Sequence, residues 1–250
     1  MEVHHHPHVQ KKNFKEYFLE FLMIFLAVTM GFFAEGIRES VSDHSKEKEY
    51  ILSLVQDLRD DTSSISNTVN QLTNASKILD TMLIQLKNGT PDPAVLNRII
   101  SSHFWTYAGY SYNNRTVQQL KNSGNFRLLR NEAVADSILQ YDNLVNTIII
   151  AQWNDLKNTM YAYKDAETRV IAYQQLYKAS SWHYTIDFND SVLVAGTKKS
   201  LATNDAQLIS LYYNRLFIHA TLLHLFISNL DYSKVRAERL IIFITKQYRL

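Results

Sequence analysis

The sequence has no cysteine, and only three prolines and six glycines in 250 residues. The lack of cysteine excludes a disulfide framework, a thiolate zinc site and a cysteine nucleophile. Proline and glycine end or weaken helices, so their scarcity favours long helices. A strong excess of one charge is also missing, since 26 Lys and Arg face 24 Asp and Glu. This balance argues against a nucleic-acid binder, and the apolar fraction of 46% argues against disorder.

One segment near the N-terminus is strongly apolar. The run Phe21–Ala34 carries no charge, but as a helix it is only about 21 Å long, short of the ~30 Å hydrocarbon core of a bilayer. Extension to Tyr17–Ile37 reaches the needed length and places Glu20 and Glu35 near the ends. The sequence therefore predicts a transmembrane anchor over residues 14–37, in preference to the buried core helix of a soluble protein.

The anchor has the features of an uncleaved signal anchor. Phe32 interrupts the small-residue pattern that a signal peptidase site requires. Positive residues favour the cytoplasmic side of a membrane. Lysines cluster before the anchor, whereas Arg38 after it lies between Glu35 and Glu39. We therefore expect a cytoplasmic His/Lys-rich tail over residues 1–13 and a large domain outside the cytoplasm. The lysines of the tail edge are Lys11, Lys12 and Lys15.

Small residues line one face of the anchor, opposite its large aromatic side chains. Small residues spaced by four let helices approach closely in lipid, and a carboxylate at membrane depth usually faces protein. The stripe is therefore a candidate helix–helix contact, for self-association or for a membrane-protein partner. A position of the carboxylate in the headgroup zone is the equal alternative. The residues of this stripe are Glu20, Ala27, Gly31 and Ala34.

No turn signal follows the anchor before Asn88-Gly89, so one helix is predicted from Phe14 to Lys87. Its second half carries a heptad seam. We interpret the seam as one wall of an intramolecular bundle, with a self-associating coiled coil as the alternative. Residues 38–89 form the stalk or bundle helix in this interpretation. The seam is Ile51, Val55, Leu58, Thr62, Ile65, Val69, Leu72, Ser76, Leu79, Leu83 and Leu86.

Capping signals divide residues 90–250 into further helices. Asp92-Pro93 begins a helix that we expect to end near Tyr107. Gly124 ends a short helix, and Asn131 caps a long one from Glu132 to about Lys178. Residues 180–199 are expected to be irregular. The last helix is predicted from Asp205, with a capping box of Asn204 and Gln207. The fold class is therefore all-α: a transmembrane helix that continues into a long helix of an elongated bundle.

Two groups of residues are candidates for binding, and both have plain structural alternatives. Histidines in the tail, His4, His5, His6 and His8, are weak metal candidates because so short a tail offers no second shell. Aromatic residues at and just beyond the end of the second predicted helix could line a ligand cleft but more simply fill the bundle. That cleft would hold Trp105, Tyr107, Tyr110 and Arg127.

No set of residues indicates catalysis. His219 and His224 lie five apart on the last predicted helix, so they face different ways. No nucleophile–base pair and no metal-ligand set is visible. We therefore expect a protein that is not an enzyme, with no cofactor and no nucleic-acid partner.

The N-terminal segment resembles the opening of a family of uncharacterised bacterial single-pass membrane proteins. The resemblance is specific over the first sixty residues and thinner beyond them. It implies native histidines and a Gram-negative envelope protein, hence an inner-membrane anchor with a periplasmic domain. The family has no activity to carry over. The resemblance rests on Met1–Pro7, Lys11–Glu35, Arg38-Glu39, Lys46–Leu58 and Gln119–Leu128.

These observations favour a non-enzymatic envelope interaction or scaffold protein. The alternative is a periplasmic ligand-sensing helical bundle. The predicted cytoplasmic tail is too short for an output domain, so sensing would require a membrane partner. A closed apolar cleft near Trp105 would favour sensing, and a solid bundle would favour the scaffold.

Overall fold

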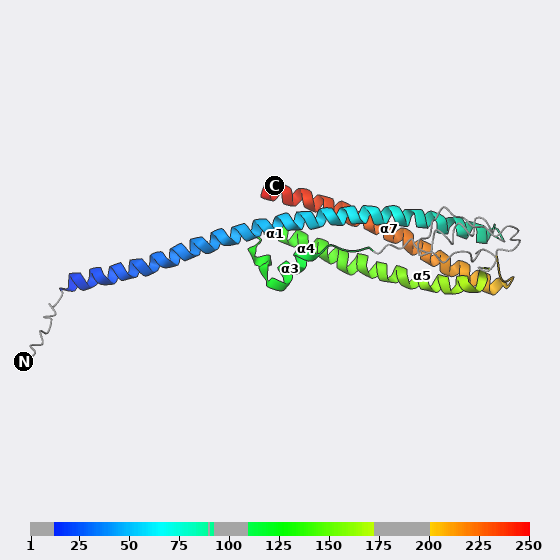
Figure 1. Cartoon of the computed structure of the whole chain (residues 1–250), viewed down its shortest axis with the longest axis horizontal. Coiled ribbons are helices and arrows are strands. Elements are labelled where there is room, and N and C mark those ends of the chain that lie inside the picture. Colours follow the sequence, from blue (N-terminus) through cyan, green and yellow to red (C-terminus); the bar gives the residue numbers. More distant parts are fainter. Residues whose placement is uncertain (1–12, 90, 93–109, 173–200) are drawn as a thin grey trace, which may run out of the picture. The chain divides into compact units, whose positions relative to one another are not determined.

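A computed structural model describes residues 13–89, 91–92, 110–172 and 201–250. Helices make up these ranges, and the strand-like feature within them is one isolated antiparallel bridge between Ile171 and Leu201. The all-α prediction is confirmed. In chain order the elements are α1 (Phe14–Lys87), α3 (Arg115–Ser123), the 3-10 helix η1 (Asn125–Leu128), α4 (Glu132–Leu144), the π-helix η2 (Val145–Ile149), α5 (Ile150–Val170) and α7 (Ala206–Tyr248) (Figure 1).

Helix α1 has 74 residues and no break, as the sequence predicts. At its start the backbone N–H of Asn13 donates to the Glu16 carboxylate at 3.0 Å. Beyond its end, Gly89 adopts φ 120°, which glycine reaches without strain. Contacts divide the chain into two compact units, residues 1–50 and 51–250, and α1 passes through the boundary.

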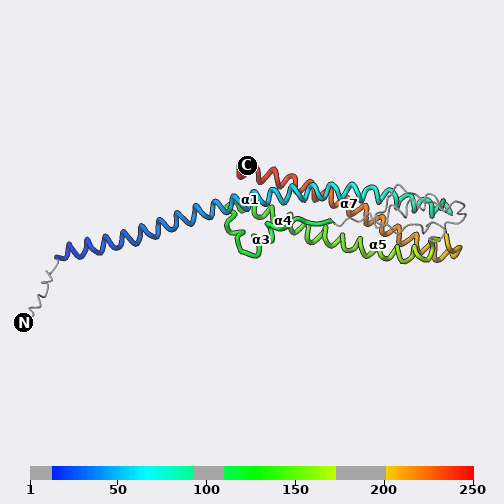
Figure 2. The backbone as a smooth tube through the Cα atoms, viewed as in Figure 1, coloured from blue at the N-terminus to red at the C-terminus, as the bar shows by residue number. Residues whose placement is uncertain are grey.

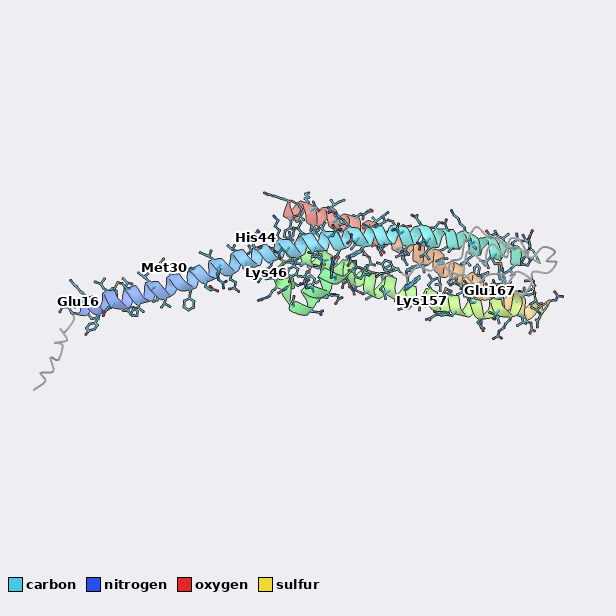
Figure 3. All side chains as sticks on the ribbon, viewed as in Figure 1. Glu16, Met30, His44, Lys46, Lys157 and Glu167 are labelled. Atoms are coloured by element: carbon cyan, nitrogen blue, oxygen red, sulfur yellow. The ribbon has the colours of Figure 1, made fainter. Side chains whose placement is uncertain are left out.

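In the first unit, α1 is long and apolar enough to cross a membrane. Its most apolar 18-residue window has a mean hydropathy of 2.0, and none of that window is buried in the chain's own fold. Met30, for example, is 69% exposed (Figure 3). The Thr29 hydroxyl donates to the Phe25 carbonyl at 2.7 Å. That bond gives the hydroxyl a partner within this apolar stretch.

The second unit buries the heptad seam of α1 among its other helices. Ile51, Ile65, Leu72 and Leu79 are at most 1% exposed. The interpretation of the seam as a wall of an intramolecular bundle is therefore confirmed. The buried face is wider than the seam, since Leu54, Ala75 and Met82 lie on it as well.

Helix α7 runs antiparallel to α4, η2 and α5 (Figure 2). Cross-helix hydrogen bonds fix this register from end to end: Asn131–Gln247, Gln152–Asn229, Thr159–His219 and Glu167–Tyr212. Between them the rings of Trp153 and Phe226 stack with centroids 5.6 Å apart. Helix α7 also runs antiparallel to α1: its His224 bonds Asp80 at 3.1 Å, and further along α7 Leu240 lines the same cavity as Leu54, which comes earlier in α1.

Two of the predicted caps are confirmed. The Asn131 side chain accepts from the Val134 N–H at 3.2 Å, and Gly124 adopts the left-handed conformation with φ 67°. The capping box is wrong, because Asp205 rather than Asn204 is the N-cap and its carboxylate accepts from the N–H groups of Gln207 and Leu208. Helix α7 consequently begins at Ala206.

The long helix predicted from Glu132 to Lys178 is also corrected. It ends at Val170, where Ile171 becomes extended with ψ 133° and pairs with Leu201. The π-helix η2 interrupts it at residues 145–149. The helix predicted from Pro93 to Tyr107 and the irregular segment 180–199 lie outside the described residues.

Candidate functional site

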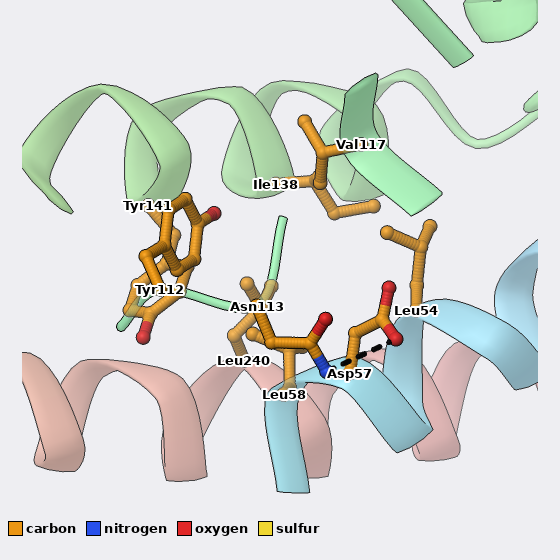
Figure 4. A pocket seen from close by; sticks show the side chains of 9 residues that line it. All are labelled: Leu54, Asp57, Leu58, Tyr112, Asn113, Val117, Ile138, Tyr141 and Leu240. Carbon is orange, nitrogen blue, oxygen red and sulfur yellow. Dashed lines mark hydrogen bonds between the residues drawn. The ribbon is translucent and has the colours of Figure 1, made fainter. Parts of the chain in front are cut away.

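Buried polar side chains meet in the second unit where α1, residues 110–114, α3 and α4 come together (Figure 4). Two carboxylates, Asp57 and Asp61, stand four residues apart on α1 and therefore share one face of the helix. That face is the buried one, so both are at most 3% exposed. We name this group the acid–tyrosine cluster. It consists of Asp57, Asp61, Asp142, Tyr110, Tyr112 and Tyr141.

Asp57 caps the N-terminus of α3 from the neighbouring helix. The N-cap residue Asn114 makes no side-chain cap bond of its own. The Asp57 carboxylate instead accepts from the Thr116 N–H at 2.9 Å and from the Arg115 guanidinium at 2.8 Å. The Asn113 amide adds a longer bond at 3.3 Å. Because a helix N-terminus favours a negative charge, the arrangement fixes α3 against α1.

Asp61 is the carboxylate of the cluster with the most perturbed acidity. It accepts from the Tyr141 hydroxyl at 2.5 Å and weakly from the Asn113 N–H at 3.4 Å. Burial raises its pKa from 3.8 to about 6, a shift that these bonds reduce and the Asp57 charge supports. Burial and the Asp61 charge together raise the pKa of Tyr141, which therefore stays a hydrogen-bond donor.

Asp142 joins the cluster to the π-helix. It accepts from the Tyr112 hydroxyl at 3.1 Å, from the Asn146 amide at 3.0 Å and from the Lys121 ammonium. The Asn146 amide lies within η2 and also reaches the Asp142 carbonyl at 2.9 Å. Single π-turns inside α-helices often occur at functional sites. Here the turn places a side-chain donor beside a carboxylate that is 1% exposed.

Tyr110 is the unsatisfied member of the cluster. It is 6% exposed, and its hydroxyl makes no hydrogen bond of good geometry among the described residues, although it interacts with the nearby Asp61 carboxylate. The hydroxyl lies close enough to Asp61 for that charge to raise the Tyr110 pKa, although burial is the larger cause. A small cavity lies beside the cluster. Its volume of about 10 Å³ holds roughly one water molecule. Its polar lining comes from Asp57, Tyr112, Asn113 and Tyr141 (Figure 4).

A second buried polar site lies between α5 and α7. His219 is fully buried, its Nδ1 lies 2.9 Å from the Thr159 hydroxyl, and its ring centroid lies 4.7 Å from that of Tyr163. Burial, with a smaller effect of the Lys164 charge, lowers its pKa from 6.5 to about 3. His224 is half exposed and bonds Asp80. The prediction that these two histidines face different ways is confirmed.

The structure describes only some of the residues that the sequence singles out. His4, His5, His6 and His8 lie outside the described residues, as do Trp105 and Tyr107. Tyr110 is buried in the cluster, while Arg127 is exposed on η1. In the anchor, Glu20 is half buried and Ala27, Gly31 and Ala34 are exposed on α1. A Cβ atom added at Gly31 would meet nothing within 4 Å.

Sequence reasoning missed Asp57, Asp61 and Asp142 as site residues. A signal was present, because Asp57 precedes Leu58 and Asp61 precedes Thr62 in the heptad seam. Carboxylates beside seam positions on a buried helix face require partners. The partners come from residues 110–142, and only the folded chain shows which they are.

The cluster can hold and exchange protons, since Asp61 is a buried carboxyl group with a raised pKa. Among the described residues, no group of three His, Cys, Asp or Glu side chains is placed to bind a metal ion. No protein-family model matches the chain, and no curated protein and no solved structure is significantly similar to it.

Proposed function

We propose that this chain is a non-enzymatic, membrane-anchored interaction or scaffold protein of a bacterial envelope. The observation that carries the proposal is the unburied apolar window of α1, which continues without a break into a packed helical unit. A helix with so apolar a surface is stable in lipid and a liability in water. The second unit then serves as the part that meets partners.

The N-terminal lysines support an inner-membrane anchor with a cytoplasmic N-terminus and a periplasmic helical domain. The resemblance of the first sixty residues to single-pass membrane proteins supports the same placement. Two of the three stretches after the anchor that carry the resemblance reach the acid–tyrosine cluster, through Asp57 and Lys121. The lipid bilayer is the first partner in this proposal.

The anchor stripe of Glu20, Ala27, Gly31 and Ala34 supports a contact with another membrane helix. The open space beside Gly31 leaves room for the close approach of a second backbone. A copy of this chain and a different membrane protein both fit such a contact.

A ligand-sensing bundle is the second candidate function. The buried acid Asp61 and the small cavity on the Asp57, Tyr112 and Tyr141 side of the cluster favour it. Room for about one water limits the ligand to a very small polar species unless the cluster opens. A sensor would also need a membrane partner that carries an output domain, so capture of such a partner from native membranes separates the two candidates.

The placement of the domain is tested by two reporters fused after Leu250, one active only outside the cytoplasm and one active only inside it. We expect activity of the outside reporter alone. Moving positive charge should reverse the result, because the lysine bias sets the orientation. The control is a chain with Lys11, Lys12 and Lys15 replaced by Gln and two lysines added at Ser40 and Ser42. Activity of the inside reporter in the parent chain would contradict the periplasmic placement.

A further inference from the structure

Helix α7 has a second face whose large side chains are exposed in the part of the chain that the structure describes. The buried side chains of α7 face α1 and α5, whereas four large side chains spaced by seven point away from them. Their exposed fractions are 38%, 53%, 48% and 54%. A seven-residue apolar repeat on an exposed helix is the pattern of a coiled-coil seam. The four residues are Leu211, Ile218, Leu225 and Tyr232.

The positions between them complete the heptad. Three residues after each of the four large side chains comes a second exposed position, and four residues later the next large side chain follows. These second positions are Asn214, Thr221, Ser228 and Val235. The small hydroxyl residues Thr221 and Ser228 let two helices approach closely but contribute little burial, and Val235 is the one apolar member of this set. The outer face of α7 therefore fits a second helix with the same repeat, bound weakly rather than obligately.

Charges on the two sides of this face select the partner. In a parallel pair, Asp231 of one helix lies beside position 236 of the other, where the same sequence has Arg236. Phe217 likewise meets Leu222 across the pair. Two-fold symmetry makes each contact twice. The face is therefore complementary to itself in the parallel orientation.

The parallel orientation also suits the anchor. Within the second unit α7 ends near Leu54, since Leu240 and Leu54 line the same cavity. A parallel pair of α7 helices therefore places residue 51 of both copies at the same end. Two anchored copies in one membrane need that arrangement, and confinement to the membrane raises their effective concentration.

We propose that the outer face of α7 is the docking surface for a second copy of this chain, in a parallel dimer of the helical unit. The parallel orientation of the dimer rests on the proposed membrane anchoring. The contacts between the two copies rest on the sequence of α7. The dimer adds a contact outside the membrane to the one proposed for the anchor stripe.

Cysteine cross-linking in native membranes tests the proposal, because the chain has no cysteine of its own. Ser228→Cys should cross-link to itself under mild oxidation, since facing positions of a parallel pair are within disulfide reach. The matched control is Asn158→Cys on α5, which is equally exposed and should stay monomeric. Leu225→Lys should reduce the yield at position 228 by about tenfold.

Charge exchange separates a specific pair from random collision. Asp231→Arg should lower the cross-link yield about fivefold, and Asp231→Arg combined with Arg236→Asp should restore it. Neither residue is buried, so we expect both substitutions to leave the fold of the helical unit unchanged. Mixed cross-linking between Thr221→Cys and Val235→Cys copies would indicate an antiparallel pair and overturn the proposal.

Equal yields at positions 228 and 158 would also overturn the proposal, as would an absence of cross-linking at both. Membrane fractionation of the same samples reports the anchor independently. A chain that cross-links at position 228 but leaves the membrane would contradict the anchoring and keep the dimer. A membrane-bound chain without the cross-link would contradict the dimer and leave the anchoring in place.

Discussion

Asp61→Asn is expected to raise the free energy of unfolding at pH 7 by about 2 to 3 kcal/mol and to leave it nearly unchanged at pH 4. Burial raises the pKa of Asp61 from 3.8 to about 6. A carboxyl group of this kind supports the native state fully below pH 3.8, and its contribution is lost as the pH rises through about 6. Asparagine keeps a neutral side chain in the same space at every pH.

The measurement is denaturant unfolding of the detergent-solubilised chain at pH 4 and pH 7, at one protein concentration. Asp60→Asn is the matched control, because Asp60 is exposed on the same helix and bonds only Gln56 among the described residues. We expect that control to change stability by less than about 0.5 kcal/mol. A lower stability of Asp61→Asn than of the parent at pH 7 would mean that the ionised carboxylate stabilises the cluster.

His219→Gln should show the opposite pH dependence. Burial lowers the pKa of His219 from 6.5 to about 3, so its neutral form supports the native state above pH 6.5. That contribution is lost as the pH falls towards 3. Between pH 7 and pH 4 the parent therefore loses about 3 kcal/mol through this residue, and the variant does not.

The two stability curves should cross. At pH 7 the variant should be about 1 kcal/mol less stable, because it loses the ring contact with Tyr163. At pH 4 it should be about 2 kcal/mol more stable than the parent. His224→Gln, on the exposed side of the same helix, is the control. Parallel curves for His219→Gln and the parent would contradict the lowered pKa, since they would mean that His219 binds protons equally in the folded and unfolded chains.

Asp61 and His219 act in opposite directions over the same pH range. The parent chain should therefore show a flatter profile than either variant. Reading each variant against the parent at the same pH separates the two contributions, since the side chains lie on different helices and share no partner among the described residues. Independent sites of this kind usually add.

The helix content and several helix ends could be predicted because they depend on local chemistry. Helix α1 runs from Phe14 to Lys87 because no proline interrupts it and Asn88-Gly89 follows. Asn131 caps α4 through its side chain, and Gly124 ends α3 because glycine adopts a positive φ without strain. At the start of α7 the sequence predicts Asn204 as the cap, but Asp205 is the N-cap, because its carboxylate accepts from two backbone N–H groups.

The acid–tyrosine cluster could not be predicted because its bonds are non-local. Asp57 finds Thr116 and Asp61 finds Tyr141 only when α3 and α4 lie against α1. The π-helix has no strong local signature either, and its turn at 145–149 depends on how α4 and α5 meet α7. The sequence did show acids beside seam positions, and a buried acid needs hydrogen-bond partners. The sequence does not show which residues those partners are.

The central claim, that the apolar N-terminal part of α1 crosses a membrane, is tested most directly by alkaline extraction of membranes from cells that express the whole chain. The parent should stay in the pellet with integral proteins. Leu26→Arg combined with Met30→Arg should release it, because each arginine near the middle of a span costs about 3 kcal/mol. Both positions are exposed in the chain's own fold, at 48% and 69%, so the helical unit is unaffected.

Val41→Arg is the control, since Val41 is 66% exposed but lies beyond the predicted anchor of residues 14–37. That variant should stay in the pellet. Release of the parent chain into the alkaline supernatant, at the level of the double-arginine variant, would contradict the membrane-spanning assignment.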